Sequence, residues 1–207
     1  MASVRVKPTR ADLAIASTIA AHARPMPELA ARVLTFGADE KLLLVLAAAG
    51  WICSRGQPAP LRRAGDHALL VTIVTSALPH LLKKVFDQTR PDRLTVRGHW
   101  RGVPRSGRRD DAFPSGHALH MGALASAAAA LPRKPRQAAW ALAAGLSLTR
   151  IIVLAHWASD VIAGFALGAL IERGLRVATS YPRGLARQPE LGARRLDPCA
   201  GTRGSDG

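Results

Sequence analysis

The 207-residue sequence is poor in aromatic residues, in cysteine and in acidic residues. Aromatic residues make up 4% of the chain, and this scarcity argues against the nucleic-acid partner that a formal net charge of +15 first suggests. The two cysteines, Cys53 and Cys199, show neither a disulfide framework nor the spacing of a metal site. The basic residues fall in loops between apolar stretches, so the charge favours anionic lipid as the partner, with no nucleic acid.

Long hydrophobic runs are also missing. The mean hydropathy is only +0.09. The apolar run at 68–82 reaches about 22 Å as a helix, against roughly 30 Å for the hydrocarbon core of a bilayer. Residues 116–131 and 138–149, however, have little polar face, and helices that are apolar on all sides must be surrounded by protein or lipid. A chain of this length cannot surround four such helices, so we expect a membrane protein.

The apolar runs predict an all-α fold class, in the form of an integral membrane bundle of five to six helices. The chain divides into an N-terminal helical or interfacial segment at 1–36, a membrane-embedded domain at 37–175 and a polar, disordered tail at 176–207. Residues 1–23 imitate a secretory signal, but polar residues weaken the apolar stretch.

Polar segments separate the apolar runs. The sequence predicts a basic loop at 54–66, a sharp helix end at 132–136, and a long polar loop at 87–113 with an arginine-rich part at 93–109. The positive-inside rule assigns the first two segments and the tail to the cytoplasm. The long loop then faces outward, although it too is basic. We therefore expect a multi-pass protein of the bacterial inner membrane with its site on the outer face.

Three stretches between residues 83 and 160 supply groups that suit the capture and transfer of a phosphoryl group. A transferring phosphoryl spreads negative charge over three oxygens, which need fixed cations and N–H donors around them. Lys83, Arg90 and Arg150 provide the cations. Ser115 provides a hydroxyl, and Gly116 provides a backbone N–H that approaches a ligand closely. The stretches therefore predict a phosphate-binding site.

Two histidines lie in these stretches, and only one of them has a carboxylate four residues later. His156 and Asp160 share one face of a helix, so Asp160 would fix the tautomer of His156 and stabilise its charged form. His156 is therefore the better candidate nucleophile and His117 the better candidate acid. His120 leaves open a metal site with His156 and Asp160, but no further ligand cluster supports it, and we expect neither a metal nor another cofactor.

The order of the three stretches resembles the motifs of the type 2 phosphatidic acid phosphatase superfamily, which includes membrane lipid phosphatases, soluble acid phosphatases and vanadium haloperoxidases. The matching residues are Lys83 with Arg90 and Pro91, then Pro114, Ser115, Gly116 and His117, then Thr149, Arg150, His156 and Asp160. Thr149 stands where the family usually has serine, and it keeps the hydroxyl. The resemblance covers residues 67–172.

The resemblance implies an all-helical core and a role for each matching residue. The implied phosphate-binding residues are Lys83, Arg90, Ser115, Gly116 and Arg150. His117 would protonate the leaving oxygen, and His156, oriented by Asp160, would attack phosphorus. The family chemistry then proceeds through a phosphohistidine intermediate that water hydrolyses without a metal ion.

The leading hypothesis is a membrane phosphatase acting on lipid phosphate monoesters or on polyprenyl diphosphates, the latter being the first substrate to test. A second hypothesis is a soluble acid phosphatase or haloperoxidase relative, which the apolar helices disfavour. A third is a non-catalytic protein that binds anionic membrane lipids through its basic loops. The complete catalytic set argues against this third hypothesis.

Overall fold

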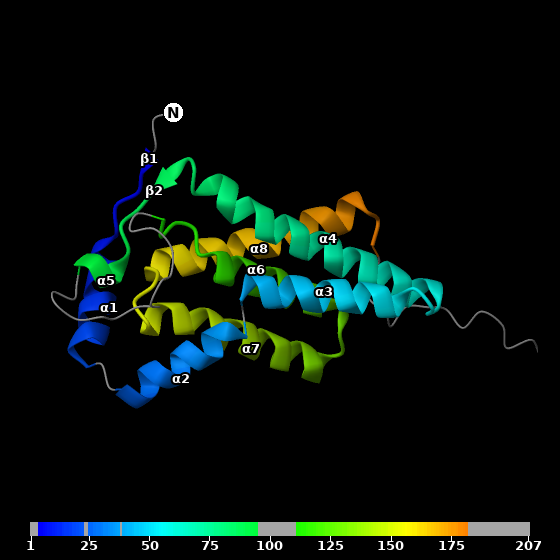
Figure 1. Ribbon diagram of the computed structural model, residues 1–207, viewed down its shortest axis with the longest axis horizontal. Helices are drawn as coiled ribbons and strands as arrows, with labels where there is room; N and C mark the ends of the chain where they lie inside the picture. The colour runs from blue at the N-terminus through cyan, green and yellow to red at the C-terminus, as the bar shows by residue number, and fades with distance from the viewer. Residues whose placement is uncertain (1–3, 23–24, 38, 95–110, 182–207) are drawn as a thin grey trace, which may run out of the picture.

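The computed structural model describes residues 4–22, 25–37, 39–94 and 111–181, which form a bundle of helices (Figure 1). In chain order the elements are β1 (Val4–Arg5), α1 (Arg10–Ala21), α2 (Pro25–Phe36), α3 (Glu40–Ser54), α4 (Ala59–Leu82), β2 (Phe86–Asp87), α5 (Pro91–Leu94), α6 (Gly116–Ala127), the 3-10 helix η1 (Ala128–Ala130), α7 (Arg133–Ile152) and α8 (Ala158–Ala178). The predicted helical fold is confirmed. One addition is the short parallel pairing of β1 with β2.

Side-chain caps explain where several helices begin. Thr9 and Asp12 form a reciprocal capping box at the start of α1. Asp39 accepts hydrogen bonds from two backbone N–H groups at the start of α3. Ser115 caps α6, and the carboxylate of Asp160 accepts a hydrogen bond from the Trp157 N–H at the start of α8. Two of these caps, Ser115 and Asp160, are therefore residues of the predicted site.

Two predicted boundaries are wrong, each because a helix is longer than its apolar run. The predicted basic loop at 54–66 is mostly helical, since α4 already begins at Ala59 with a proline in its first turn, where proline is tolerated. The predicted sharp helix end at 132–136 is confirmed, since η1 ends at Ala130 and the next helix, α7, begins at Arg133. The predicted tail boundary falls inside α8, where Arg176 is buried and bonded to Glu172. The rest of the predicted tail and the loop at 95–110 lie outside the described residues.

The helices alternate in direction, so that the bundle has two distinct ends (Figure 1). The turn between α3 and α4, the start of α7 and the end of α8 lie at one end. The end of α4 and the starts of α6 and α8 lie at the other end, together with α5 and α1. The basic segments at 54–66 and 132–136 therefore share one end, and the motif residues gather at the opposite end.

Glycine allows α6 and α8 to pack backbone to backbone. A Cβ placed on Gly168 would lie 1.9 Å from the carbonyl oxygen of Leu119, and one on Gly122 would lie 1.9 Å from that of Phe165. A Cβ on Gly164 would meet the Ser115 carbonyl oxygen at 2.5 Å. This close approach at three glycines fixes the start of α6 against α8.

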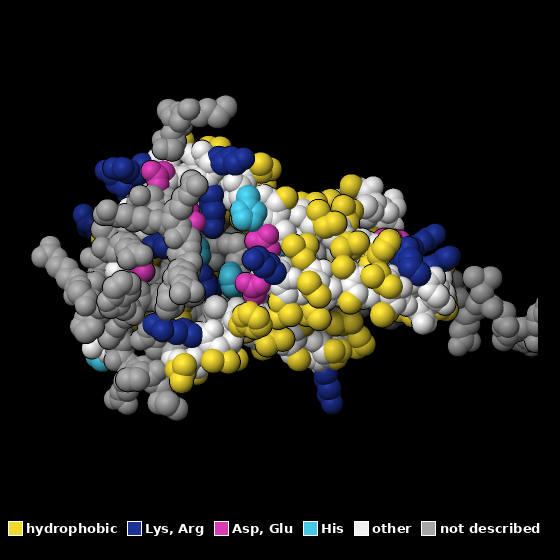
Figure 2. Space-filling model, in the orientation of Figure 1, with side chains coloured by type: hydrophobic (Ala, Val, Ile, Leu, Met, Phe, Trp, Pro, Cys, Tyr) yellow, Lys and Arg dark blue, Asp and Glu magenta, His cyan; other side chains and the backbone are white. Residues whose placement is uncertain are grey.

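Many large apolar side chains remain on the outside of the bundle (Figure 2). Those that are more than half exposed include Val33, Phe36, Val45, Leu46, Ile52, Leu142, Leu148, Ile162, Leu170 and Val177. Lys and Arg side chains instead gather toward the two ends of the molecule in this view. Within the described part of the chain, no helix is both long enough and apolar enough to qualify as a membrane span.

Candidate active site

Two of the three predicted phosphate-binding cations meet at one carboxylate. Lys83 caps the C-terminal end of α4, and its Nζ lies 3.7 Å from Oδ2 of Asp111. Arg90 donates to Oδ1 of Asp111 from Nε at 2.9 Å and from one terminal nitrogen at 2.8 Å. The other terminal nitrogen of Arg90 donates to the Ala155 carbonyl at 3.3 Å. Arg90 is thus tied both to Asp111 and to the turn that precedes His156.

The third cation, Arg150, approaches from the last turn of α7. Its side chain is 4% exposed, and its buried Nε has no hydrogen-bond partner among the described residues. A buried guanidinium donor without a partner is costly, because it has lost water and gained nothing in return. An anion bound at this nitrogen would remove that cost.

Ser115 and Gly116 form the start of α6. Ser115 is fully buried, and its backbone N–H donates to the Asp160 carbonyl at 3.3 Å, which ties α6 to α8. A Cβ on Gly116 would make only ordinary contact with Pro79, at 3.6 Å, so packing within the protein does not require glycine here. A helix N-terminus with uncommitted N–H groups attracts anions. The position therefore suits the predicted role in phosphate binding.

The His156 ring is held by a backbone carbonyl. His156 is 3% exposed, and its Nδ1 lies 2.6 Å from the carbonyl oxygen of Ala112. Since a carbonyl only accepts hydrogen bonds, Nδ1 carries the proton and donates it to Ala112. The lone pair of His156 is then on Nε2, where a nucleophile needs it.

The contacts of Asp160 differ from the direct hydrogen bond to the His156 ring that the sequence suggested. Its Oδ2 lies 3.9 Å from Nδ1 of His156, which is close enough for an ion pair but too long for a hydrogen bond. The same oxygen accepts the Trp157 N–H at 2.9 Å. Asp160 therefore shapes the turn that carries His156, while the direct hydrogen bond to the ring comes from Ala112.

Burial and neighbouring cations set the ionisation of His156 and Lys83. Burial lowers the pKa of His156 well below its ordinary value, and the charges of Arg150, Arg90 and Lys83 lower it further. The hydrogen bond to Ala112 opposes this shift. Burial also lowers the pKa of Lys83, and Asp111 opposes that shift. The three cations therefore lie near the His156 ring and keep it neutral.

His117 is the second residue of α6 and lies in the same cluster. The charges of Arg150 and Lys83 act on its ring, which also reaches the backbone of Thr35 in α2. The Thr35 hydroxyl lies 2.7 Å from that of Thr149, the residue before Arg150. Because the Thr149 hydroxyl donates to the Leu146 carbonyl, Thr35 is the donor in this pair. Helix α2 therefore supports both the candidate acid and the third cation.

The N-terminal helix α1 is also built into this end of the bundle. Asp12 is 2% exposed and accepts hydrogen bonds from the backbone N–H of Ser159 at 2.9 Å and from its hydroxyl at 2.8 Å. Ala16 packs against Ala112 and Trp157 in one buried cluster. In the segment at 1–36, predicted to be helical or interfacial, residues 10–21 and 25–36 are helical, and α1 holds the first turn of α8 beside His156.

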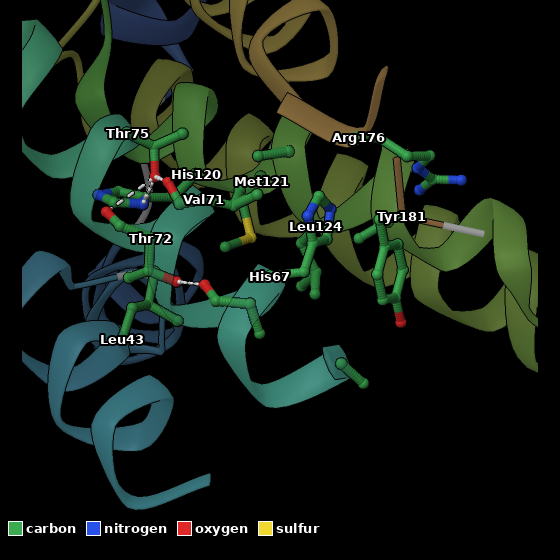
Figure 3. Close-up of a pocket in the computed structure, with 14 residues that line it drawn as sticks. Leu43, His67, Val71, Thr72, Thr75, His120, Met121, Leu124, Arg176 and Tyr181 are labelled. Atoms are coloured by element: carbon green, nitrogen blue, oxygen red, sulfur yellow. Dashed lines mark hydrogen bonds between the residues drawn. The ribbon is translucent and has the colours of Figure 1, made fainter. Parts of the chain in front are cut away.

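His120 points away from the cluster, toward a cavity of about 190 Å³ between α3, α4, α6 and α8. Its Nδ1 lies 2.9 Å from the Thr75 hydroxyl. Figure 3 shows Thr75 and His120 at one end of this cavity and Arg176 and Tyr181 at the other. Among the described residues, no group of three or more His, Cys, Asp or Glu side chains is arranged to hold a metal ion.

A second buried polar cluster surrounds Glu172, which is fully buried in α8. Glu172 accepts hydrogen bonds from Ser126 at 2.5 Å and from Arg176 at 2.9 Å, and it contacts Nε2 of His67 at 3.0 Å. The Tyr181 ring stacks on His67, with 4.4 Å between centroids. This cluster joins α4, α6 and α8 at the end of the bundle away from His156.

The structure brings together all eight predicted site residues, and it adds four that the sequence did not indicate: Asp12, Thr35, Asp111 and Ala112. Asp111 follows an arginine-rich stretch and is the second of two adjacent aspartates, an ordinary feature of a polar segment. Ala112 acts through its carbonyl, which every residue possesses. Asp12 and Thr35 act across more than 100 residues of sequence. None of the four carries a local signal.

Comparison with known proteins gives matches over most of this region. The family model described as PAP2 superfamily matches residues 67–182. A lipid A 1-phosphatase of Rhizobium johnstonii is 37% identical over 117 residues, which is 56% of this chain and 48% of that protein. A lipid A 1-phosphatase of Rhizobium etli is 36% identical over 116 residues, or 56% of this chain and 50% of that protein. The chain thus spans about half the length of these curated relatives.

Two solved structures share the fold. Aquifex aeolicus LpxE superimposes with a TM-score of 0.68 at 16% identity, covering 83% of this chain and 98% of that one. A transmembrane PAP2 type phosphatidylglycerolphosphate phosphatase from Bacillus subtilis superimposes with a TM-score of 0.57 at 21% identity, covering 82% of this chain and 85% of that one. At these identities the similarity establishes the fold alone.

Proposed function

Because the chain belongs to the PAP2 superfamily, we propose that it is a membrane phosphatase that hydrolyses a lipid phosphate. The observation that carries this proposal is the His156 ring, buried and neutral, with its Nδ1 proton directed at the Ala112 carbonyl and three cations nearby. A nucleophile for phosphorus needs a free lone pair, and the transferring phosphoryl needs positive charge around it.

In the proposed reaction, Nε2 of His156 attacks phosphorus and the bond from phosphorus to the ester oxygen breaks. His117 gives its proton to the leaving oxygen, so the lipid alcohol departs neutral. His117 then accepts a proton from water, and the water oxygen displaces Nε2 from phosphorus. Inorganic phosphate leaves, and His156 returns to its starting form.

The three cations make a metal ion unnecessary in this scheme. A phosphomonoester carries a charge of about −1.5 to −2 at neutral pH. Lys83, Arg90 and Arg150 offset this charge, together with the Ser115 hydroxyl and the Gly116 N–H at the start of α6. The unpartnered Nε of Arg150 supports this assignment, since phosphate would give it an acceptor.

For the substrate, we propose a glycolipid phosphate monoester. The support is the similarity to two relatives described as lipid A 1-phosphatases. Polyprenyl diphosphate remains the second candidate, because the predicted chemistry is the same for any lipid phosphate. The exposed apolar side chains support a position in the membrane. The basic segments at 54–66 and 132–136 lie at the end away from His156, and by the positive-inside rule they support an outward-facing site in a bacterial inner membrane.

The test is phosphate release by the full chain in detergent, in the presence of EDTA, from lipid A 1-phosphate, phosphatidylglycerol phosphate, phosphatidic acid and undecaprenyl diphosphate. We expect hydrolysis of at least one of these lipids and fastest release from lipid A 1-phosphate. The variant His156→Ala should lose at least about 10³-fold in rate, since it removes the nucleophile. The matched control is His22→Ala, which changes an exposed histidine at the C-terminal end of α1.

Each failure has a distinct meaning. Release that persists in His156→Ala would remove the assigned nucleophile. Release only after metal is added would contradict the metal-independent route. Lipid binding without release from any substrate would favour a non-catalytic lipid-binding protein.

A further inference from the structure

The Asp111 carboxylate lies where a phosphate would be expected. It contacts two of the three cations, with Oδ1 at Arg90 and Oδ2 at Lys83. Both the Nε and a terminal nitrogen of Arg90 donate to it, which is the way guanidinium groups bind carboxylates and phosphates. An anionic side chain of the protein is therefore already bound by the groups assigned to the substrate.

The charge of this carboxylate fits a role before substrate binding. The partly exposed Lys83 and the buried Arg90 and Arg150 repel one another. Burial lowers the pKa of Lys83, and the charges of Arg90 and Arg150 lower it further. Asp111 opposes that shift. With Asp111 ionised, three cations and one carboxylate leave a net charge of about +2, which matches a phosphomonoester dianion.

Asp111 is also connected to the nucleophile through the chain. The next residue, Ala112, accepts the hydrogen bond from His156, and its N–H donates to the Gln88 carbonyl at 3.0 Å. Gln88 lies two residues before Arg90. Two consecutive residues therefore hold the site: the Asp111 side chain contacts Lys83 and Arg90, and the Ala112 carbonyl accepts from His156.

We propose that Asp111 is a positioning residue that serves as the internal counter-ion of the phosphate site. It holds Lys83 and Arg90 in place when no phosphate is bound, and it competes with phosphate for both. This inference rests on the proposed function, because it assumes that these cations bind phosphate. Its consequence is weaker binding of the product, so that phosphate leaves after each turnover.

The experiment is calorimetric titration of the purified full chain with inorganic phosphate, which requires no turnover. In Asp111→Asn the side chain keeps its shape and loses its charge, so phosphate no longer displaces a charge-assisted hydrogen bond. We expect the Kd of the Asp111→Asn variant for phosphate to be roughly tenfold lower than that of the wild type. In lipid hydrolysis, KM should fall and kcat should fall with it, because product release becomes slower. Asp111→Glu keeps the charge and should bind phosphate like the wild type.

Asp66→Asn is the matched control. Asp66 of α4 pairs with Arg55. It lies 17 positions before Lys83, or roughly 25 Å away along the helix. The control removes the same charge at a distance and should leave the Kd unchanged. If Asp111→Asn does not fold, as judged by thermal unfolding, Asp111→Ser removes the charge with a smaller side chain.

An unchanged or weaker phosphate affinity in the uncharged variants overturns the inference, because a merely structural role predicts weaker binding. Absence of phosphate binding in every variant also overturns it. The proposed function fails by a different result, namely absence of hydrolysis in the lipid panel, so the two failures are distinguishable.

Discussion

The environment of the His156 ring links catalysis to stability. Its Nδ1 proton is committed to the Ala112 carbonyl, and Nε2 would have to be protonated beside Arg150, Arg90 and Lys83. Burial and these charges lower its pKa well below the ordinary value of 6.5. The folded protein therefore resists a proton that the unfolded chain accepts at about pH 6.5.

This difference predicts a loss of stability in acid. A group whose pKa is lower in the folded state destabilises the protein as the pH falls below the pKa of the unfolded state. Between pH 7.5 and 5.5, His156 should contribute a loss on the order of 1 kcal/mol. Unfolding in detergent at both pH values should therefore show a smaller acid-induced loss in His156→Asn than in the wild type. His22→Asn, at an exposed position, serves as control, and an equal loss in all three proteins would contradict the prediction.

Among the elements, α6 and α8 set the geometry of the site. Helix α6 carries Gly116 and His117 directly after Ser115, and α8 carries Asp160. The backbones approach so closely at Gly122 and Gly168 that neither position has room for a Cβ. Any side chain there must separate the two helices, since the opposing atoms belong to the backbone.

Gly168→Ala should therefore destabilise the protein and lower its activity. The added Cβ would lie 1.9 Å from the Leu119 carbonyl oxygen, and overpacking of this kind costs about 1–3 kcal/mol. The measurement is the unfolding midpoint together with the rate of phosphate release.

Gly174→Ala is the control on the same helix, because no atom lies within 4 Å of its added Cβ. It should be neutral or stabilising by up to about 1 kcal/mol, since alanine favours helix over glycine. Equal behaviour of the two variants would mean that the close approach of α6 and α8 is not required.

The two N-terminal helices complete the site from outside the region that the family model matches. Asp12 of α1 holds Ser159 at the start of α8, and Thr35 of α2 holds Thr149 beside Arg150. These contacts reach the turns on either side of His156. The N-terminal helices therefore support the end of the bundle that carries His156.

At the scale of the whole molecule, the outer surface is apolar in the middle and basic toward the ends (Figure 2). Such a distribution of exposed apolar side chains is typical of a surface that contacts lipid or another protein. We therefore predict that the chain, expressed in a bacterium, remains in the membrane fraction after an alkaline carbonate wash. Its release by the wash would instead indicate that it binds the surface through its basic segments.

A charge on the apolar surface should separate these two cases. Leu170 is 62% exposed in α8, so in water Leu170→Asp would change stability by only about 0.5 kcal/mol. In a bilayer the same change would cost about 2.5–3.5 kcal/mol, and the yield of folded protein in membranes should fall. Arg136→Asp, at an exposed position in the first turn of α7, is the control and should be tolerated. Equal yields of both variants would contradict lipid contact at Leu170.

The sequence determined which residues form the proposed site and which segments become helices. Lys83, Arg90, Ser115, His117, Arg150 and His156 were recognisable because their residue types are rare in apolar surroundings and occur in a fixed order. Helices were recognisable from continuous apolar runs. The ends of the helices were harder to recognise, since the first turn of α4 has the proline and arginine content of a loop.

The tertiary structure alone decided how those residues are held. The partner of His156 is a backbone carbonyl, the counter-ion of the cations comes from the end of an arginine-rich loop, and the supports of α8 and α7 come from the N-terminal helices. Each contact joins segments distant in sequence, and its energy depends on distance and burial in the folded chain. Neither the distance nor the burial can be read from local composition, because the same carbonyl or carboxylate would be solvated in another fold.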